Sequence, residues 1–297
     1  MKTEYTEIIV DIHDHAAWIG INRPEVLNAF REQTLDELAD ALTDVRCDPE
    51  LAAVVIYGVG GNFSAGGDMH AMLRLNKANS EQWNDRMLRV AMLCRNISVP
   101  VIAMVDGYCV GGGHELMLWC DLVVTSKDAV FGQTGAKVGA CPTVGATQYI
   151  SRLIGERRAK EMIFLCKRYS GEEAASLGLA NRAVDSSELL ETVTAMCQEI
   201  ATYSGQTLRA TKVSLNFEGD QLYASWQHGM ELLANIWGSE ESIEGMTAFL
   251  EGRAPDFMKF RQARKAEMNQ WQDGFEQGLN QGSRSRSARV DSAGATA

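Results

Sequence analysis

The sequence predicts an α/β fold, because short buried strands alternate with glycine-rich turns and helices in the middle of the chain. The segment AAVVIYG (52–58) is an apolar run that ends in glycine, and VIAMVDG (101–107) follows Pro100 in the same way. A glycine turn and then a helix-like segment follow each run. Two such strand–turn–helix units imply parallel strands joined by crossover helices.

Periodicity predicts the remaining elements. Two β-prone runs, 6–13 and 17–22, flank the polar pair Asp14-His15 and predict an N-terminal hairpin, while 121–126 predicts another strand. Apolar residues recur at helical spacing in seven segments, which are 33–45, 80–97, 157–166, 171–178, 187–203, 221–236 and 239–250.

These elements divide the chain into three parts. Residues 1–200 form the α/β core and 201–261 a helical C-terminal region. Residues 262–297 are expected to be partly helical and then disordered, because the end QGSRSRSARVDSAGATA has almost no large apolar residue to bury.

Composition excludes several classes of protein. The net charge of -11 is spread along 297 residues, which opposes non-specific binding to nucleic acid or an anionic membrane. No apolar stretch approaches the ~20 residues of a membrane helix, and no basic leader precedes an apolar run, so we expect a cytoplasmic protein. The seven cysteines show no metal-binding spacing and are interpreted as reduced thiols: Cys47, Cys94, Cys109, Cys120, Cys141, Cys166 and Cys197.

Two glycine turns carry the strongest chemical signal. GGGHE (111–115) lies between a buried strand and a helix, so it exposes free backbone N–H groups at the positive end of that helix. SAGGD (64–68) follows the other strand. Because parallel strands end at the same edge of a sheet, the two turns could hold one oxygen on which negative charge develops. Each turn alone is more simply an ordinary tight turn.

Glu115 is the candidate acid or base. It lies in the first turn of the predicted helix, where it could act as a base or position water, or merely complement the helix dipole. Asp68 is more simply interpreted as a helix N-cap, and His114, which lies on another helix face, as a structural or a surface residue. Neither G-x-G-x-x-G nor a P-loop is present, so a nucleotide cofactor is not expected.

Five stretches together resemble the crotonase (enoyl-CoA hydratase/isomerase) superfamily over residues 5–261. The resemblance implies a spiral of β-β-α units, a helical C-terminal region that builds homotrimers or dimers of trimers, and a CoA thioester held between the glycine turns. It implies no cofactor beyond that coenzyme A, and no metal. The stretches are INRPEVLNAF (21–30), NFSAGGD (62–68), PVIAMVDGYCVGGGHELMLWCDLVV (100–124), VFGQTGAKVG (130–139) and GEEAASLGLANRAV (171–184).

The resemblance also assigns roles to residues. The amides of Gly67 and Gly112 map onto the oxyanion hole of the family, and Glu115 onto a catalytic glutamate. Arg253 falls where a basic residue approaches the CoA phosphates. The residues expected to contact the acyl group or CoA are Val26, Leu27, Ala65, Gly66, Asp68, Met69, Tyr108, Val110, Gly111, Thr134, Gly135, Pro142, Trp237 and Arg253.

Within the superfamily, FGQTGAKVG, CKRYSG (166–171) and EGRAPDFMKF (251–260) are most similar to the 1,4-dihydroxy-2-naphthoyl-CoA synthase and 2-ketocyclohexanecarboxyl-CoA hydrolase branch. The sequence departs from that branch at three positions. The branch has an aspartate and a serine where this chain has Ala140 and Pro142, and a tyrosine where this chain has Trp237. Hydratases carry a second glutamate that aligns with Gly135 here. The chain is thus a mosaic of the two groups.

The resemblance implies an acyl-CoA enzyme. The leading hypothesis is addition of water to a linear or cyclic α,β-unsaturated acyl-CoA, with Glu115 activating the water. One alternative is hydrolytic C–C cleavage of a cyclic oxoacyl-CoA. Another is a CoA-binding homologue without catalytic activity.

Overall fold

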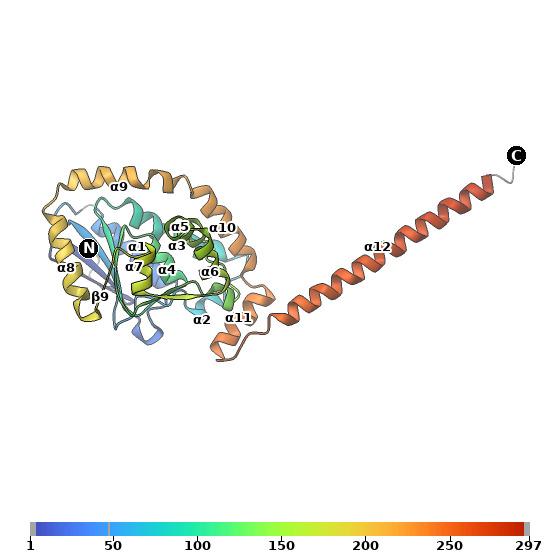
Figure 1. Cartoon of the computed structure of the whole chain (residues 1–297), viewed down its shortest axis with the longest axis horizontal. Helices are drawn as coiled ribbons and strands as arrows, with labels where there is room; N and C mark the ends of the chain where they lie inside the picture. The colour runs from blue at the N-terminus through green and yellow to red at the C-terminus, as the bar shows by residue number, and fades with distance from the viewer. Residues whose placement is uncertain (1–3, 47, 294–297) are drawn as a thin grey trace. The chain divides into compact units, whose positions relative to one another are not determined.

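The computed structural model describes residues 4–46 and 48–293, with side chains up to residue 275, so Cys47 lies outside the described residues. The chain divides after Arg253 into two units. The main sheet of the first unit lies among helices (Figure 1) and has the strand order β1-β2-β3-β4-β6-β9. Its strands are β1 (Ile8–His13), β2 (Ala16–Ile21), β3 (Ala53–Gly58), β4 (Val101–Val105), β6 (Leu122–Ser126) and β9 (Arg182–Val184).

The register of this sheet confirms the predicted α/β arrangement. β1 and β2 form an antiparallel hairpin, with Ile8 opposite Ile21. All later neighbours are parallel, including β3 with β4. The parallel strands read as continuous apolar runs because both faces of the sheet are covered.

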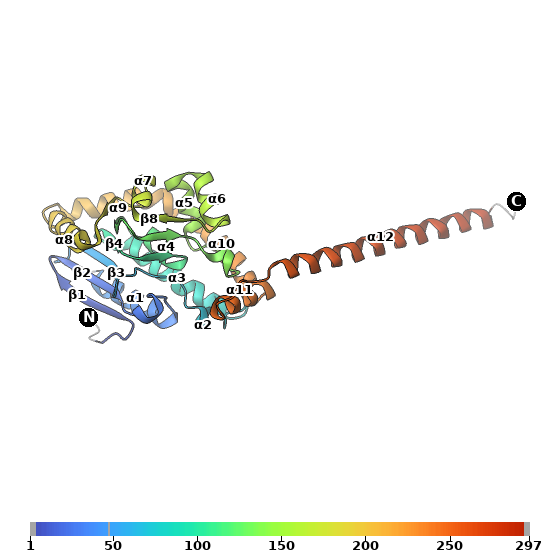
Figure 2. The same ribbon diagram turned by 60° about the horizontal axis from the view of Figure 1, so that its bottom comes forward.

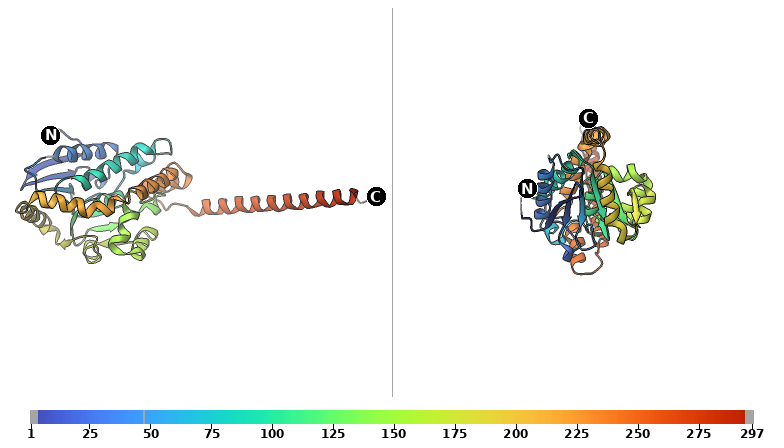
Figure 3. Two further views of the ribbon diagram at one scale, coloured as in Figure 1. Left: turned by 90° about the horizontal axis from the view of Figure 1, so that it is seen from above. Right: turned by 90° about the vertical axis from the view of Figure 1, so that its left-hand side faces the viewer.

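Two layers of helix cover the sheet. On one face, β3 side chains pack in the large core with helices α1 (Glu32–Val45) and α3 (Ser80–Asn96). On the other face, neighbouring side chains of the same strands pack against α8 (Ser186–Ala201). Alternate residues of a strand point to opposite faces, so β3 contributes to both layers. The ribbon views show helices on both sides of the strands (Figures 2 and 3).

A second sheet has the order β5-β7-β8, and the sequence did not predict it. Its strands are β5 (Tyr108–Val110), β7 (Val130–Gly132) and β8 (Arg168–Ser170). A three-residue strand is too short for an alternating apolar pattern to show, so periodicity cannot identify it. β5 matters for function because it leads directly into α4 (Gly112–Leu118).

All seven predicted helical segments are helices, and each observed end lies within two residues of the predicted one. Besides α1, α3 and α8 they are α6 (Glu156–Phe164), α7 (Gly171–Leu177), α10 (Tyr223–Ile236) and α11 (Glu240–Leu250). The structure adds α2 (Met69–Met72), α5 (Ala146–Ile154), α9 (Gly205–Asp220) and the 3-10 turns η1 (Pro24–Val26) and η2 (Gly135–Lys137). The C-terminal region is helical as predicted, and its role in trimer formation stays a prediction.

One buried lysine anchors α9. Of the sixteen residues of α9, all of them described, Lys212 alone is buried. Its Nζ donates to Cys94 O at 2.8 Å and Val99 O at 3.0 Å, and lies 2.6 Å from Asp121 Oδ2. These three contacts join α9 to the end of α3 and to the segment before β6.

Lys212→Met is therefore expected to destabilise the protein. The change leaves the Asp121 carboxylate and two carbonyls without their cation, which should lower the free energy of unfolding by about 2–3 kcal/mol, less than for a fully buried pair because Asp121 is partly exposed. Denaturant unfolding measures this. An unchanged midpoint would show that Lys212 does not anchor the helix.

The second unit contains the helix α12 (Met258–Ala293). Helical structure thus continues into the predicted tail, whose residues 294–297 lie outside the described residues. The division at 200 and 261 stays a prediction. Among the described residues, no helix combines the length and the apolar character needed to cross a bilayer.

Candidate active site

Hydrogen bonds between two chain segments bring the glycine turns together. Ser64 N donates to Tyr108 O at 2.8 Å, and Val110 N donates to Ser64 O at 3.1 Å. Ser64 also forms an isolated parallel bridge with Cys109. The segment after β3 therefore runs alongside β5, and the two turns that follow lie at the same level.

The turns are in direct contact. A Cβ added at Gly66 would lie only 2.7 Å from Gly112 N and 3.0 Å from Val110 O. Gly66 has a φ of +95°, a conformation that favours glycine. A Cβ at Gly113 would lie 2.3 Å from Ser64 O. Glycine is therefore required here both for the backbone conformation and for the close approach of the two segments.

The amides of Gly67 and Gly112 are available to a ligand. Phe30 N donates to Gly66 O, and Asp68 N donates to Phe30 O, which fixes the first turn on either side of Gly67. Neither Gly67 N nor Gly112 N donates a hydrogen bond to any residue that the structure describes. Gly112 is the first residue of α4, where a backbone N–H has no partner within the helix.

Glu115 lies one turn into α4 and is buried, with 6% of its surface exposed. Its Oε1 accepts a hydrogen bond from Val144 N at 2.8 Å. Trp119 Nε1 donates to Val144 O at 3.1 Å, so two side chains one helical turn apart, Glu115 and Trp119, hold the segment that meets the carboxyl group. Burial raises the pKa of Glu115 to about 8, although the amides of Val144 and Ala146 act in the opposite direction.

This shift predicts how stability depends on pH. Between pH 4.5 and about pH 8 the folded protein keeps a proton on Glu115 that the unfolded chain releases. The free energy of unfolding should therefore fall as pH rises through this range, by at most about 1.4 kcal/mol per pH unit, and level off above it. The difference in stability between Glu115→Gln and the wild type should grow with pH from 5 to 8. A difference independent of pH would contradict the shift.

Glu115 and both glycine turns line one pocket. Its empty volume, including the open mouth, is about 580 Å³. Ten residues expected at the site lie on its wall, which are Glu115, Gly67, Gly112, Ala65, Met69, Gly111, Thr134, Gly135, Pro142 and Trp237. The rest of the wall is mostly apolar, so the pocket combines a low-dielectric interior with a few polar groups.

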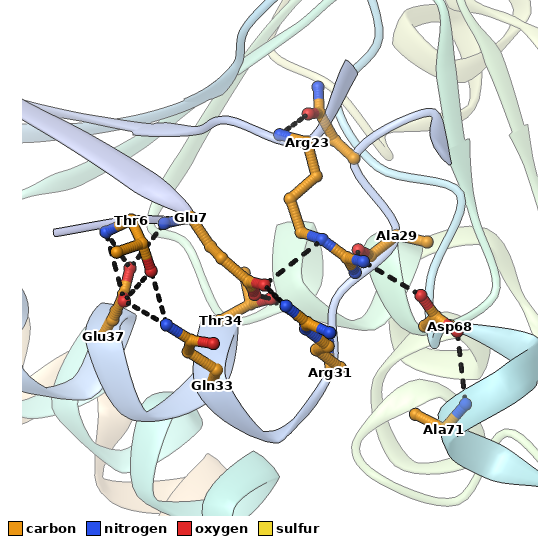
Figure 4. Close-up of polar contacts among 11 residues, drawn as sticks. Thr6, Glu7, Arg23, Ala29, Arg31, Gln33, Thr34, Glu37, Asp68 and Ala71 are labelled. Atoms are coloured by element: carbon orange, nitrogen blue, oxygen red, sulfur yellow. Dashed lines mark hydrogen bonds and ion pairs between the residues drawn. The ribbon is translucent and has the colours of Figure 1, made fainter. Parts of the chain in front are cut away.

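Asp68 does not line the pocket. Its Oδ1 accepts from His70 N and Ala71 N at the start of α2, and its Oδ2 lies 3.1 Å from Arg23 Nη2 (Figure 4). Arg23 also donates to Ala29 O at 2.6 Å. These contacts make Asp68 a helix cap that ties the first glycine turn to the 23–30 loop.

The other expected contacts lie outside the pocket wall. Val26 and Leu27 are exposed at the η1 turn. Gly66, Tyr108 and Val110 take part in the backbone contacts that hold the two glycine turns together. Arg253 makes ion pairs with Glu244 at 2.7 Å and Glu251 at 2.6 Å. The predicted CoA contacts of these residues stay predictions.

Several wall residues were not predicted as site residues. They are Phe30, Met87, Gln133, Val138, Ala140, Cys141, Val144 and Leu233. Met72 and Trp83 also lie on the wall, and the sequence suggests them as apolar residues of the loops that line the pocket. The spacing of Leu233 from Trp237, one helical turn, places both on one face of α10 and could have indicated the former. Nothing in the sequence indicates that residues 138–144 cross in front of Glu115.

His114 is structural, as predicted from its helix face. It is fully buried, and burial lowers its pKa to about 3, so the ring is neutral. Its Nδ1 lies 3.2 Å from Gln133 Nε2, which also donates to Gly111 O at 3.3 Å. His114 therefore supports the second glycine turn through Gln133.

Comparison with solved structures shows the same fold. An enoyl-CoA hydratase from Mycobacterium avium subsp. paratuberculosis K-10 is 26% identical with a TM-score of 0.78, covering 86% of this chain and 99% of that one. An enoyl-CoA hydratase/isomerase from Xanthobacter autotrophicus Py2 is 27% identical with a TM-score of 0.78, covering 84% and 94%. A methylmalonyl-CoA decarboxylase in complex with 2-nitronate-propionyl-CoA is 26% identical with a TM-score of 0.76, covering 86% and 99%.

The expected crotonase-like α/β fold is thus confirmed. The family model for enoyl-CoA hydratase/isomerase matches residues 11–261, which is most of the chain and includes both glycine turns and Glu115. The chain therefore belongs to the crotonase, or enoyl-CoA hydratase/isomerase, family of acyl-CoA-processing proteins.

Proposed function

We propose that this protein adds water to the double bond of an α,β-unsaturated acyl-CoA. One observation carries the proposal: the free amides of Gly67 and Gly112 and the buried carboxyl group of Glu115 line the same apolar pocket. Addition of hydroxide to the β-carbon sends negative charge to the thioester oxygen. Two preorganised N–H donors in a water-poor site stabilise that charge, each by a few kcal/mol.

Glu115 supplies the base in this mechanism. Its carboxylate takes a proton from water as the oxygen attacks the β-carbon, and the raised pKa makes it a stronger base than an exposed glutamate. The bond from Val144 N to Oε1 fixes the carboxyl group in the pocket wall, where it can meet the water. The reaction needs no cofactor beyond the coenzyme A of the substrate.

A second candidate is hydrolytic C–C cleavage of a cyclic oxoacyl-CoA. Glu115 is the one carboxylate among the described residues of the pocket wall, and activating water for attack on a ring carbonyl requires only one base. The same pair of amides would stabilise the departing enolate. A CoA-binding homologue without catalytic activity is disfavoured by the raised pKa of a buried carboxyl group that serves no ion pair.

Three finer expectations remain part of the proposal. The motif similarity to the 1,4-dihydroxy-2-naphthoyl-CoA synthase and 2-ketocyclohexanecarboxyl-CoA hydrolase branch favours a bulky or cyclic acyl group, for which the apolar wall offers contacts. Assembly as a homotrimer or a dimer of trimers follows from the family resemblance, and a cytoplasmic location follows from the cysteines interpreted as reduced thiols.

Incubation with linear and cyclic enoyl-CoA and oxoacyl-CoA esters tests the proposal, with products read by mass and chromatography. Hydration predicts a hydroxyacyl-CoA, 18 mass units heavier than the enoyl ester because one water is added. Ring opening predicts a dicarboxylic mono-CoA ester instead. Tight binding of several esters with no turnover of any would overturn both reactions and support the binding homologue.

A further inference from the structure

Hydration of a double bond requires two groups that handle protons. One removes a proton from water, and the other delivers a proton to the α-carbon of the enolate. Among the described residues of the pocket wall, only Glu115 and Cys141 have side chains that titrate. Because Glu115 acts as the base, the proton for the α-carbon comes from Cys141 or from water.

The backbone around Gly135 places Cys141 on the wall. Ala140 N donates to Gly135 O at 2.9 Å, which folds the 139–142 segment back over η2. A Cβ at Gly135 would lie 2.7 Å from Ala140 O and 3.6 Å from Cys141 N. The missing side chain at 135 therefore makes room for the segment that carries Cys141.

The surroundings of Cys141 keep a proton on its sulfur. The thiol is partly buried in the pocket wall, and burial raises its pKa above that of an ordinary cysteine. The charge that Glu115 carries when it is ionised acts in the same direction. A thiol held in this way is a proton donor at neutral pH and a poor nucleophile.

We propose that Cys141 is a catalytic residue that donates its proton to the α-carbon of the substrate. The inference rests on the proposed hydration and deepens it by naming the second proton-handling group. It also indicates a substrate whose α-carbon comes close to the 139–142 segment while its thioester oxygen lies between the glycine turns.

The proposed step balances. As the water oxygen forms the new bond to the β-carbon, the π electrons move to give the enolate, and the water proton goes to Glu115. The enolate then collapses to the thioester, the S–H bond of Cys141 breaks, and a C–H bond forms at the α-carbon. A proton returns from Glu115 to the Cys141 thiolate, which restores both groups. The net change is the addition of one water.

Hydrogen exchange at the α-carbon separates Cys141 from Glu115. In D₂O, a saturated acyl-CoA that fits the pocket should gain deuterium at the α-carbon without addition of water, through the minor fraction of Cys141 that is ionised, and faster as the pH rises. We expect Cys141→Ala to lower this exchange by about 10²-fold or more, while Glu115→Gln retains it within about threefold. Hydration should fall in both variants.

Two further variants make the result specific. Cys120→Ala removes a partly exposed thiol outside this pocket and should change neither rate. Cys141→Ser keeps the shape but has a much weaker acid, so its hydration rate should lie between those of the wild type and Cys141→Ala. Its rate should also lack the decline at alkaline pH that marks loss of the thiol proton in the wild type.

The outcomes distinguish this inference from the proposed function. If the wild type hydrates an enoyl-CoA and Cys141→Ala keeps its exchange rate and pH profile, the role of Cys141 is refuted while hydration stands. If the wild type turns over no enoyl-CoA, the proposed function fails. Alkylation of Cys141 by a maleimide, read by peptide mass, would then show whether an acyl-CoA still shields this thiol, and no shielding would refute its contact with substrate.

Discussion

Replacement of Glu115 by glutamine is expected to lower kcat on the correct acyl-CoA by about 10²–10⁴-fold, the usual contribution of a general base. Glutamine has the shape of the protonated glutamate, so the hydrogen bond from Val144 N can form in the variant as well. The fold and the affinity for CoA esters should therefore be retained. Steady-state kinetics measures the loss of kcat, and thermal unfolding checks that the fold is retained. The matched control, Glu156→Gln on the exposed surface of α6, should behave as the wild type.

The pH dependence of the rate shows whether Glu115 acts as a base or as an acid. If Glu115 is a base, kcat/KM for the free enzyme should rise about tenfold per pH unit up to about pH 8 and then stop rising, since only the carboxylate accepts a proton. A rate that instead falls as the pH approaches 8 would mean that the protonated form of Glu115 is the active one. Full activity of Glu115→Gln would exclude both roles.

Gly66→Ala is expected to have the second large effect, at least about 10²-fold on kcat, comparable to the loss of one oxyanion donor. A Cβ at this position meets Gly112 N at 2.7 Å and Val110 O at 3.0 Å, both backbone atoms that cannot turn aside. The two turns would have to separate, so the amides of Gly67 and Gly112 could no longer share one oxygen. Affinity for CoA itself should change much less than turnover.

The matched control for this change is Gly61→Ala. Gly61 also has a positive φ, +82°, but a Cβ there has no described atom within 4 Å. The two variants therefore share the conformational strain of alanine and differ in the clash between the turns. Similar losses of stability with a loss of activity in Gly66→Ala alone would support the account. Equal activities would show that the spacing of the turns does not limit the reaction.

The sequence revealed those parts of the structure that depend on local patterns. The hairpin, the buried strands and seven helices each contain enough residues for an apolar period to show. The glycine turns could be predicted for a related reason: GGGHE and SAGGD each follow a buried strand, and parallel strands end at one edge. Glu115 follows from its place in the first turn of α4.

Contacts between residues far apart in the sequence determine the parts of the site that local patterns do not predict. Val144 is 29 residues from Glu115 along the chain, and its amide nevertheless fixes that carboxyl group. The positions of Cys141, Val138 and Leu233 on the pocket wall depend on how η2, α5 and α10 pack around the pocket. Asp68 shows the opposite case, since its capping role could be predicted locally while its ion pair with Arg23 joins residues 45 positions apart.

The central claim is that two backbone amides polarise the thioester carbonyl of the substrate. Difference infrared spectroscopy of an acyl-CoA labelled with ¹³C at the thioester carbon observes this bond directly, in the wild type and in Gly66→Ala. The account predicts that the C=O stretch shifts to lower frequency on binding to the wild type, and that the shift largely disappears in the variant although the ester stays bound. A bound ester with the carbonyl frequency it has in water would contradict the claim.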